Sequence, residues 1–398
     1  MDITIQPGKL SGNIQAIPSK SQAHRLLICA AFANSDTTLI CPDTNRDIEA
    51  TVDCLNALGA SIVRTASGYS VDPISHIPEK TELNCCESGS TLRFLMPIVG
   101  ALGIDTTFRM EGRLPQRPLS PLWEEMERMG CTLSRPTETT IRCQGKLKSG
   151  EFTISGGVSS QFITGLLFAA ALMDGESHIR ITGKLESAPY VTMTQAAMAL
   201  FGVNTSGLHI KSGQDFHTPG HITVEGDWSN AAFWLAANAL GSDLDVKNLK
   251  PNSPQGDRMI AQYLSQLDSF AVIDATDTPD LVPILAITAG AKNGAKFIHC
   301  SRLRLKETDR LETTAAMINN LGGSAVIEDD TLTVHGTGYH GGTVDALNDH
   351  RIAMSAGIAA TVCSGPVTIL NAHEVKKSYP GFWEDYKKLG GNYELYLR

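Results

Sequence analysis

The sequence contains no hydrophobic run long enough to span a bilayer. The longest apolar run, residues 162–173, falls short of the ~20 residues that a membrane helix needs, and Thr164 interrupts it. Residues 1–5 carry neither the basic region nor the apolar core of a secretory signal. We therefore expect a cytoplasmic protein that does not bind a membrane.

Positive charge is also scarce. The chain has 33 lysine and arginine residues against 42 aspartate and glutamate residues, a net charge of −9, which disfavours a nucleic-acid partner. A protein of this charge that handles anions must gather its cations locally. The nine cysteines are scattered and odd in number, which suits a reducing compartment better than a disulfide framework.

Several familiar catalytic and metal-binding patterns are missing. The sequence has no G-x-S-x-G motif and no Cys/His pair with the logic of a catalytic triad. Residues 336–341 match G-x-G-x-x-G, but they lead into Gly342-Thr343-Val344 rather than a helical pattern, which predicts a turn. His217 and His221 flank a Pro-Gly pair and cannot share a helix face, so we expect no zinc site.

What the sequence does contain is an internal repeat. Amphipathic helical patterns that end in a Leu-Gly, Met-Gly or Phe-Gly pair recur along the chain. They cover residues 52–59, 122–130, 193–202, 313–322 and 382–390, and a sixth, residues 259–267, is followed by Asp268 instead of glycine. The first three glycines of these pairs are 71 and 72 residues apart, and the last two are 68 apart.

Each repeat also carries a second helical pattern that is apolar on nearly every side and rich in alanine and glycine. Such patterns cover residues 21–33, 89–103, 159–173, 229–240, 281–291 and 349–363. A helix that is apolar all round is a buried helix. Six units of strands with one buried and one half-exposed helix, in two groups of three, predict an α+β fold with two domains.

Cations stand at the starts of these buried helical patterns. Lys20, Arg25, Arg93 and Arg351 cannot cap a helix N-terminus because they offer only donors, and the positive helix end disfavours them unless an anion is bound. We infer that several helix N-termini converge on one cleft that binds more than one anionic group.

Other helix starts carry polar residues with a simpler explanation. Ser159 and Ser229 could be ordinary N-caps. The run Lys306-Glu307-Thr308-Asp309-Arg310 joins a loop to a helical pattern, with Thr308 the expected N-cap. Two cations at that junction indicate an anion site, with Glu307 held between them.

Six motifs stand in order along the chain and carry a resemblance. They are Pro18-Ser19-Lys20-Ser21-x-x-x-Arg25, Arg117-Pro118, Ser159-Ser160-Gln161, Lys306-Glu307-Thr308-Asp309-Arg310, Asn348-Asp349-His350-Arg351 and Lys377-Ser378-Tyr379-Pro380. Together with the repeat, they make the chain resemble the 5-enolpyruvylshikimate-3-phosphate synthases of the enolpyruvyl transferase family over almost its whole length. The Lys-Glu-Thr-Asp-Arg and Asn-Asp-His-Arg motifs are highly specific in combination, although either alone would be weak.

The resemblance implies the two-domain enolpyruvyl transferase fold, with six βαβαββ units, three per domain, and buried parallel helices. One domain would cover residues 20–226 and carry the residues that bind shikimate 3-phosphate. The other would be discontinuous and join residues 1–19 to residues 227–398, with the two specific motifs. The active site would be the cleft between them, which closes on the substrates.

The resemblance implies a transferase that joins phosphoenolpyruvate to shikimate 3-phosphate in the shikimate pathway to chorismate and the aromatic amino acids. The enolpyruvyl group would pass to the 5-hydroxyl by addition and elimination through a tetrahedral intermediate, with release of phosphate. No metal and no organic cofactor is implied, and the family is the target of glyphosate. Shikimate 3-phosphate would be held by Lys20, Ser21, Arg25, Ser159, Ser160, Gln161, Ser187, Tyr190, Asp280 and Lys306. Phosphoenolpyruvate would be held by Lys20, Gly89, Arg117, Gln161, Arg310, Arg351 and Lys377.

Two carboxylates and a lysine would carry the implied chemistry. Glu307 would exchange the proton at the methylene carbon, and Asp280 would orient and deprotonate the 5-hydroxyl. Lys20 would stabilise the charge that develops on phosphoenolpyruvate. On the residues alone, Asp280 could be only a charge at a helix N-terminus, so its role depends on the resemblance.

Some residues depart from the family pattern. Pro18 and Arg302 stand where glycine and asparagine are frequent, and Glu87 adds a carboxylate to the second buried helical motif. Glu87 needs a partner near a phosphate pocket, and Arg93 is the candidate that the sequence offers. These changes leave the chemistry in place but bear on the affinity for phosphoenolpyruvate and on glyphosate sensitivity. Of the adjacent Lys376 and Lys377, the spacing to Pro380 favours Lys377.

Three other interpretations stay open. UDP-N-acetylglucosamine enolpyruvyl transferase has the same repeat but uses a cysteine in a mobile loop, and residues 112–118 here contain none. A non-catalytic anion-binding protein would be weakened by Asp280 and Glu307, and an RNA-processing relative is disfavoured by the net charge. We expect a monomer, because no large apolar stripe is left exposed once the helices are placed.

Overall fold

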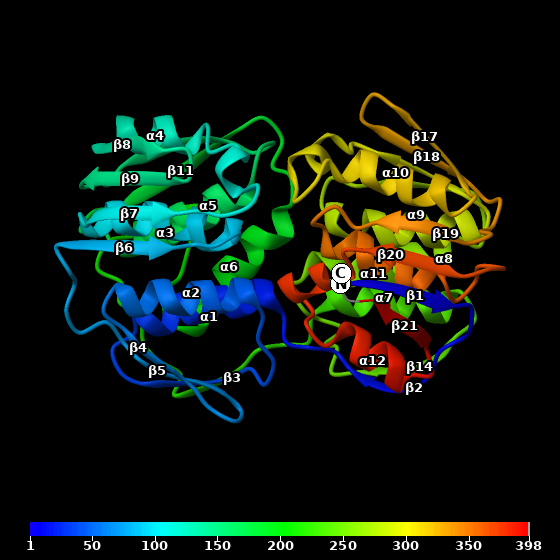
Figure 1. Cartoon of the computed structure of the whole chain (residues 1–398). Helices are drawn as coiled ribbons and strands as arrows, with labels where there is room; N and C mark the ends of the chain where they lie inside the picture. The colour runs from blue at the N-terminus through cyan, green and yellow to red at the C-terminus, as the bar shows by residue number, and fades with distance from the viewer. Residues whose placement is uncertain (397–398) are drawn as a thin grey trace. The chain divides into compact units, whose positions relative to one another are not determined.

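The computed structural model describes residues 1–396 (Figure 1). The chain forms two compact units. The continuous unit is Pro18–Val224, and the discontinuous unit joins Met1–Ile17 to the chain from Glu225 onward. The chain therefore passes between units after Ile17 and Val224, two residues before each boundary that the family resemblance implies.

The continuous unit contains three sheets of related topology. The most complete has the strand order β6-β7-β9-β8. The strands β6 (Lys80–Asn84) and β7 (Asp105–Arg109) are parallel, and β8 (Cys131–Thr137) forms an antiparallel hairpin with β9 (Thr140–Gly145). A parallel pair needs a crossover, which is α3 (Gly89–Leu102), and α4 (Leu122–Arg128) leads to the hairpin, giving the βαβαββ order.

The other two sheets of this unit are β13-β3-β5-β4 and β10-β11-β12. Their strands are β3 (Thr37–Ile40), β4 (Ser61–Arg64), β5 (Gly68–Asp72), β10 (Glu151–Ser155), β11 (Ser177–Thr182), β12 (His209–Ile210) and β13 (His221–Thr223). The accompanying helices are α1 (Lys20–Ala31), α2 (Arg46–Ala57), α5 (Ser160–Ala171) and α6 (Ala188–Leu200), with the 3₁₀ turn η1 (Leu114–Gln116). The late strand β13 takes the first position of its sheet, parallel to β3.

The discontinuous unit repeats this plan. Its sheets are β15-β16-β18-β17, β19-β20-β1-β21 and β14-β2. The strands are β1 (Asp2–Gln6), β2 (Ser11–Gln15), β14 (Asp243–Lys247), β15 (Ala271–Asp274), β16 (Ala295–Ile298), β17 (Ser324–Glu328), β18 (Thr331–His335), β19 (Gly342–Asp345), β20 (Val367–Leu370) and β21 (Asn392–Tyr396). The helices are α7 (Trp228–Ala239), α8 (Ile260–Gln266), α9 (Val282–Ala291), α10 (Arg310–Asn320), α11 (His350–Ala359) and α12 (Phe382–Lys388). The 3₁₀ turns are η2 (Gly256–Met259), η3 (Pro279–Leu281), η4 (Ser301–Leu305) and η5 (Ala372–Lys377).

The N-terminal strand β1 ties the start of the chain to its end. It lies between β20 and β21, where Ile3 is opposite both Ile369 and Leu395. The loop at residues 336–341 connects two strands, β18 and β19, and so forms no helix, as the sequence predicts.

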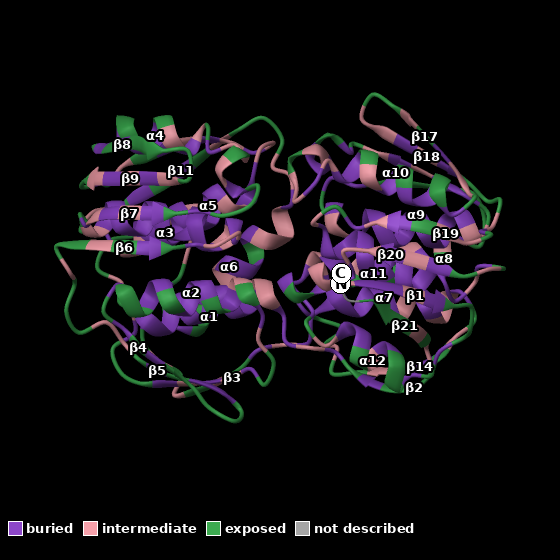
Figure 2. Ribbon diagram, viewed as in Figure 1, coloured by how far each residue is buried: buried purple, intermediate pink, exposed green. Residues whose placement is uncertain are grey.

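The apolar helical patterns form buried helices, coloured purple over most of their length in Figure 2. In α9, every residue from Val282 to Gly290 is buried. The helix α5 approaches α3 closely at Gly165, where a Cβ atom would lie 2.3 Å from the carbonyl oxygen of Arg93. Each unit therefore has its own core of buried helices under its sheets.

Some amphipathic helices begin earlier than their periodicity indicates, whereas α4 and α12 begin at the predicted residues, Leu122 and Phe382. The helix α2 starts six residues before the predicted position 52, because Asn45 caps it by accepting from the N–H of Ile48. The helix α10 starts three residues early, at Arg310. Polar first turns carry no apolar period, which is why the pattern misses them.

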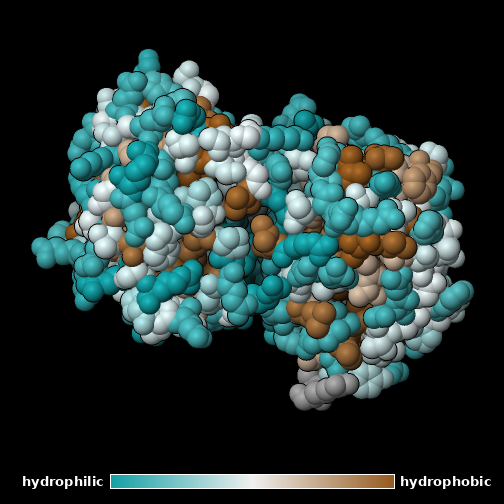
Figure 3. Space-filling view, turned by 90° about the horizontal axis from the view of Figure 1, so that it is seen from above, coloured by the Kyte–Doolittle hydropathy of each residue, from teal (hydrophilic) through white to brown (hydrophobic). Residues whose placement is uncertain are grey.

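The exposed surface carries scattered hydrophobic side chains. On the face shown in Figure 3, hydrophobic residues form small groups among hydrophilic ones in both units. The most exposed large apolar side chains include Val272 and Val63, which lie in different units. Among residues 1–396, none of the helices combines the length and apolar character that crossing a membrane requires.

Candidate active site

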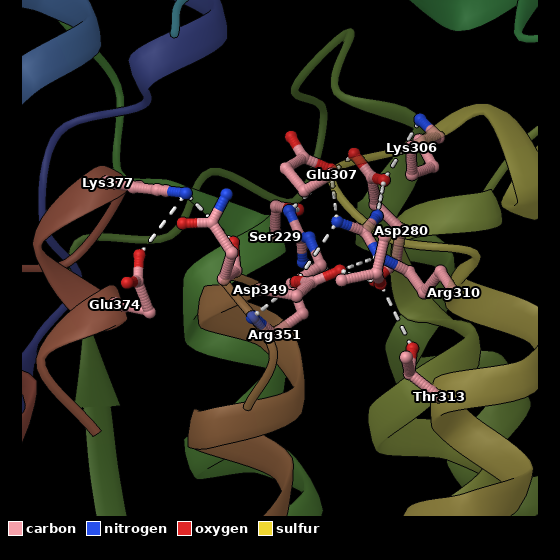
Figure 4. A network of polar contacts seen from close by, with 12 residues as sticks. Ser229, Asp280, Lys306, Glu307, Arg310, Thr313, Asp349, Arg351, Glu374 and Lys377 are labelled. Atoms are coloured by element: carbon pink, nitrogen blue, oxygen red, sulfur yellow. Dashed lines mark hydrogen bonds and ion pairs between the residues drawn. The ribbon is translucent and has the colours of Figure 1, made fainter. Parts of the chain in front are cut away.

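Six charged side chains of the discontinuous unit form one connected set, which we call the Arg310 network (Figure 4). Its members are Asp280, Lys306, Glu307, Arg310, Asp349 and Arg351. All six stand at or just before the N-terminal ends of α9, α10 and α11. Three helix N-termini therefore meet within this unit. The predicted convergence of the helix starts that carry Lys20, Arg25, Arg93 and Arg351 on one cleft stays a prediction.

Arg310 is the centre of the network, with 1% of its side chain exposed. Its Nε donates to Oδ2 of Asp349 at 2.8 Å, and its Nη1 donates to Oδ1 of Asp280 at 2.7 Å. Its Nη2 donates to Oε2 of Glu307 at 2.5 Å and to Oδ1 of Asp349 at 3.2 Å. Because a guanidinium has five N–H groups, these four bonds leave one N–H, on Nη1, for a ligand.

The carboxylates around Arg310 affect its pKa more than its burial does. Burial alone would lower the pKa of Arg310, but Asp349, Glu307 and Asp280 raise the pKa above its usual value. For Asp349 the effect of burial has the opposite sign and would raise its pKa. The positive charge of Arg310 is the main cause that lowers the pKa of Asp349 below its ordinary value. The pair therefore stays ionised across the physiological range.

Asp280 faces three cations. Its Oδ1 lies 3.1 Å from Nζ of Lys306 and 2.7 Å from Nη1 of Arg310, and its Oδ2 lies 3.6 Å from Nη2 of Arg351. Burial would raise the pKa of Asp280, but these three cations hold the pKa well below its ordinary value. Asp280 is therefore ionised and is a weak base for as long as the cations face it.

Lys306 and Arg302 share the same neighbourhood. Burial lowers the pKa of Lys306, Asp280 raises it, and the positive charges of Arg310 and Arg302 lower it further. Arg302 lies in η4 and is 9% exposed. Arg302, which stands where asparagine is frequent in the family, therefore adds positive charge near the Lys306 ammonium.

Arg351 extends the network toward α7. Its Nη1 donates to the backbone oxygen of Asp280 at 3.1 Å, and its Nη2 donates to Oγ of Ser229 at 2.6 Å. Lys377, at the end of η5, donates to the backbone oxygen of Asn348 at 2.9 Å and pairs with Glu374 at 3.2 Å. Figure 4 shows Lys377 approaching the same helix start as Arg351.

Two expectations about helix caps are wrong. Asp309, not Thr308, caps α10 by accepting from the N–H of Glu312 at 3.2 Å. The hydroxyl of Thr308 instead donates to Asp349 at 3.1 Å, because the helix begins one residue later than a Thr308 cap requires.

Ser229 is likewise not a cap, because it stands inside the first turn of α7. Asp227 caps that helix by accepting from the backbone N–H groups of Ser229 and Asn230. Ser159, in contrast, caps α5 by accepting from the N–H of Gln161, so the simpler interpretation holds for it.

Lys20 is paired in the continuous unit. It is the first residue of α1, and its Nζ lies 2.8 Å from Oδ2 of Asp47 in the first turn of α2. The sequence did not single out Asp47. The only signal for it is an acidic residue just after a good N-cap, Asn45, which many helices share.

Arg25 is a buried cation, 2% exposed, that joins three helices. Its Nε donates to Oγ1 of Thr194 at 2.8 Å, and its Nη2 donates to Oγ1 of Thr164 and to the backbone oxygen of Tyr190. Its Nη1 donates to the backbone oxygen of Ser21, and its Cζ lies over the Phe94 ring at 5.0 Å. Burial lowers the pKa of Arg25 to about 10, because these partners are neutral.

A second group of polar side chains surrounds the start of α3. Nη1 of Arg93 donates to Oε1 of Gln161 at 2.7 Å, and Nε2 of Gln161 donates to Oγ of Ser90 at 3.0 Å. Gly89 opens the helix, and a Cβ atom there would lie 2.9 Å from Nη1 of Arg117. The absent side chain thus leaves room for the Arg117 guanidinium beside free backbone N–H groups.

Glu87 lies close to a glycine on the neighbouring loop. A Cβ atom at Gly112 would overlap its carboxylate, and Gly112 has φ of +54°. Arg93 donates to Gln161 and to the backbone oxygen of Pro118. The expected partnership of Glu87 with Arg93 stays a prediction.

The other predicted residues of this unit lie on the first turns of α1, α5 and α6. Ser160 is the first residue of α5 and is buried. Ser187 precedes α6 with φ of +55°, and the Tyr190 ring lies 6.0 Å from the Arg25 Cζ. The structure thus brings Ser21 and Tyr190 together through Arg25. Within residues 1–396, no group of three or more histidine, cysteine, aspartate or glutamate side chains is arranged to hold a metal ion.

The chain has close relatives among known proteins. A family model described as EPSP synthase (3-phosphoshikimate 1-carboxyvinyltransferase) matches residues 5–278 and 265–386. The 3-phosphoshikimate 1-carboxyvinyltransferase of Clostridium kluyveri is 38% identical over 98% of this chain and 97% of its own length. That of Clostridium acetobutylicum is 39% identical, again over 98% of this chain and 97% of its own length.

Solved structures agree with the fold. Two structures of EPSP synthase from Acinetobacter baumannii match with TM-scores of 0.79 and 0.81 at 22% and 21% identity. They cover 99% and 100% of this chain, and all of each matched chain is covered. At this identity they bear on the fold alone, which is the mixed two-domain fold of those enzymes. Taken with the family model and the full-length relatives, the repeat and the motifs place this chain in the EPSP synthase (3-phosphoshikimate 1-carboxyvinyltransferase) family.

Proposed function

We propose that this chain transfers the enolpyruvyl group of phosphoenolpyruvate to the 5-hydroxyl of shikimate 3-phosphate and releases phosphate. The observation that carries the proposal is the Arg310 network, where two carboxylates, Asp280 and Glu307, are held by buried cations at three helix starts. Both substrates carry a phosphate and a carboxylate, so the cations match the charges to be bound.

The continuous unit supplies the side chains for shikimate 3-phosphate in this proposal. Arg25 is a buried cation with neutral partners, so an anionic ligand would provide the missing countercharge. Hydroxyls and an amide on the first turns of neighbouring helices would bind the phosphate and ring oxygens. These residues are Ser21, Ser159, Ser160, Gln161, Ser187 and Tyr190, and Lys306 and Asp280 would complete the set from the discontinuous unit.

Phosphoenolpyruvate would be held by cations that converge on a free helix N-terminus. In the discontinuous unit these are Arg310, Arg351 and Lys377. In the continuous unit Lys20, Arg117 and Gln161 would act with the backbone at Gly89. Arg310 has one N–H left, so we assign it chiefly to holding Asp280 and Glu307, with a single bond to the ligand.

The reaction needs proton transfer at two atoms. In the addition step, Glu307 in its protonated form gives a proton to the methylene carbon of phosphoenolpyruvate. Asp280 takes the proton of the 5-hydroxyl, and the 5-oxygen forms a C–O bond with C2 of phosphoenolpyruvate. In the elimination step, the C–O bond to phosphate breaks and the leaving phosphate takes the proton held by Asp280, while the methyl group returns a proton to Glu307 and the double bond forms again. Lys20 would stabilise the negative charge of the phosphate as it leaves.

The ion pairs of Asp280 suggest how its basicity is controlled. Three cations hold its pKa low. Substrate phosphate and carboxylate groups would draw Lys306 and Arg351 away, and the pKa of Asp280 would rise as the countercharge is lost. Substrate binding would in this way convert an inert carboxylate into a base.

Phosphate release from phosphoenolpyruvate tests the function directly. The purified chain should release phosphate only when shikimate 3-phosphate is present as acceptor. UDP-N-acetylglucosamine should give no release, because residues 112–118 lack the cysteine that the related transferases use. Release with the second acceptor, or none with the first, would contradict the proposal.

The state of the protein in the cell is part of the same proposal. We propose a cytoplasmic monomer, supported by exposed apolar residues that are scattered rather than gathered. Light scattering after size exclusion should give the mass of one chain. A mass of two or more chains at assay concentration would overturn this.

A further inference from the structure

A buried chain of polar side chains crosses the continuous unit, and the reaction proposed above does not use it. The chain begins on α1, passes through α2 and ends at the N-cap of α3. Its members are His24, Thr51, Thr91 and Ser88, and each is 0% exposed. A buried polar group is costly unless it is hydrogen-bonded, so four in succession among apolar helices need an explanation.

Hydrogen bonds connect the four side chains in one sequence. Nδ1 of His24 lies 2.7 Å from Oγ1 of Thr51, which in turn lies 2.7 Å from Oγ1 of Thr91. Oγ1 of Thr91 donates to Oγ of Ser88 at 2.7 Å, and the backbone N–H of Thr91 donates to the same oxygen at 3.2 Å. Ser88 thereby caps α3, the helix that Gly89 opens.

The donors and acceptors of this chain follow from its end at Ser88. A hydroxyl has one hydrogen, and Thr91 gives its hydrogen to Ser88, so Thr91 accepts from Thr51. Thr51 has then used its own hydrogen and accepts from an N–H at Nδ1 of His24. The other ring nitrogen, Nε2, has no hydrogen-bond partner within residues 1–396. Burial is the largest cause that lowers the pKa of His24 well below its ordinary value, so the ring is neutral.

The chain runs beside the ion pair of Lys20. Lys20 and His24 are one helical turn apart on α1, and their partners Asp47 and Thr51 are one turn apart on α2. The two pairs therefore join α1 to α2 at successive turns. Thr91 extends this join to α3, because its Oγ1 lies 3.5 Å from the backbone oxygen of Asp47 as well as bonding to Thr51.

We propose that Thr51 and Thr91 are positioning residues that fix Lys20 relative to the backbone N–H groups at the start of α3, so that both reach one phosphoenolpyruvate. Hydrogen bonds have a narrow range of lengths and angles, whereas apolar contacts have no preferred direction. A chain of hydroxyls therefore sets the register of the three helix starts, which apolar side chains of the same size would leave free to slip. The inference rests on the proposed binding of phosphoenolpyruvate by Lys20 and by the backbone at Gly89.

Steady-state kinetics of Thr51→Val tests the proposal. Valine removes the hydroxyl at nearly constant shape and cuts the chain, while Ser88 and Thr91 still cap α3. KM for phosphoenolpyruvate should rise about fivefold or more, which corresponds to the loss of one buried hydrogen bond. We expect kcat and KM for shikimate 3-phosphate to stay within about threefold of wild type. Thr51→Ser, which keeps the hydroxyl, should return KM for phosphoenolpyruvate to within about twofold of wild type.

A double-mutant cycle shows whether the two threonines act as one unit. Thr91→Val should raise the same KM, and adding Thr51→Val to it should cause little further change, because the chain is already cut. If Thr91→Val does not fold, Thr51→Val and Thr51→Ser alone carry the test.

Thr37→Val is the matched control. Thr37 is buried in the same unit, and its Oγ1 lies 2.6 Å from Oγ1 of Thr218, so the change also removes a hydroxyl from a hydroxyl pair. Thr37 belongs to no predicted site. The control should lower the melting temperature as the other valine variants do, but it should leave both KM values unchanged.

Nitrogen NMR of the histidine rings tests the direction of the chain, with the His24 signals assigned by their loss in His24→Gln. These signals should be those of a neutral ring with its hydrogen on Nδ1. A hydrogen on Nε2 would contradict the proposal, because Thr51 would then donate to His24. Thr91 would have to donate to Thr51, and the chain would no longer reach Ser88.

Two kinetic results would overturn the proposal. One is a wild-type KM for phosphoenolpyruvate in both Thr51→Val and Thr91→Val. The other is an equal rise of both KM values that Thr51→Ser does not reverse, which is the result of structural damage alone.

Lys20→Met tests the premise separately. If it leaves KM for phosphoenolpyruvate unchanged, the proposed role of Lys20 is wrong, and the inference fails with it. If it raises that KM while the two valine variants do not, the role of Lys20 stands and only the positioning role of the threonines is wrong.

Discussion

Arg310 and Asp349 form a buried ion pair, with Nε of Arg310 2.8 Å from Oδ2 of Asp349 and side-chain exposures of 1% and 0%. The carboxylate also caps α11 by accepting from the N–H of Arg351 at 2.9 Å. The Asp349 side chain thus fixes the start of α11 and also holds Nε and Nη2 of Arg310. The Arg310 guanidinium in turn holds Asp280 and Glu307. The pair therefore orders the candidate site.

Replacing Asp349 with alanine should destabilise the protein strongly. The change removes a helix cap and leaves Arg310 with less countercharge, and breaking a buried pair costs about 3 kcal/mol or more. Urea denaturation at neutral pH measures the loss. Thr313→Ala, which removes a hydroxyl that is bonded to Thr308 at the start of α10, should cost far less.

The stability that Asp349 contributes should depend on pH in a definite direction. Because the pKa of Asp349 is lowered in the folded state, its contribution to the free energy of unfolding is complete above the unfolded pKa of about 3.9. The contribution is lost as the pH falls toward the folded pKa. The gap between wild type and Asp349→Asn should therefore narrow on acidification, and a gap that widens would contradict this assignment.

The sequence was most informative where one physical signal decided the structure. The helix α9 was predicted because its residues are apolar on every side, and all of its residues from Val282 to Gly290 are buried. The six units were found because five of them end a helix with an apolar residue followed by glycine, and the sixth has Leu267-Asp268 at the same place. The cations Arg310 and Arg351 were found because a cation at a helix start needs an anion.

The sequence was least informative about contacts between segments that are far apart along the chain. Nothing local indicates that β1 lies between β20 and β21, or that Lys20 pairs with Asp47. In Thr308-Asp309 either side chain could cap the helix, and the choice depends on where Asp349 lies. The sequence also does not indicate that Asp257 is buried, because Gln255-Gly256-Asp257 has the composition of an exposed turn, whereas tertiary packing buries it.

Glu307→Gln and Asp280→Ala should each lower kcat by about 10²-fold or more, since general acid–base groups contribute on this scale. Phosphate release under saturating substrates measures kcat. Glu312→Gln is the matched control, because Glu312 lies in the first turn of the same helix but is 58% exposed and pairs with Arg304. Wild-type turnover in either of the first two variants would remove the role assigned to that residue.

Gly89→Ala should weaken phosphoenolpyruvate binding. The new Cβ atom would lie 2.9 Å from Nη1 and 3.3 Å from Cζ of Arg117, so the guanidinium must move. We expect KM for phosphoenolpyruvate to rise about tenfold or more, equivalent to about 1.4 kcal/mol. Gly8→Ala is the control, because no atom lies within 4 Å of its added Cβ. Equal KM values for phosphoenolpyruvate in the two variants would contradict this prediction, because the Arg117 guanidinium would then have moved without weakening binding.

Arg25→Met should separate ligand binding from stability. Burial lowers the pKa of Arg25 to about 10, so the folded protein pays for holding this charge among neutral partners. An apolar side chain of similar length should leave the melting temperature of the free protein unchanged or higher. Shikimate 3-phosphate at 100 times its Kd should stabilise the wild type by about 2.7 kcal/mol but should not stabilise the variant.

The control for this experiment is Arg64→Met in the same unit. Arg64 lies over the Tyr69 ring at 4.7 Å and donates to the backbone oxygen of Cys41, so it is held by neutral partners as Arg25 is. It belongs to no predicted site, and its variant should keep the full melting shift with shikimate 3-phosphate. If Arg25→Met also keeps that shift, the buried cation serves packing alone, and the acceptor phosphate must be bound by other side chains.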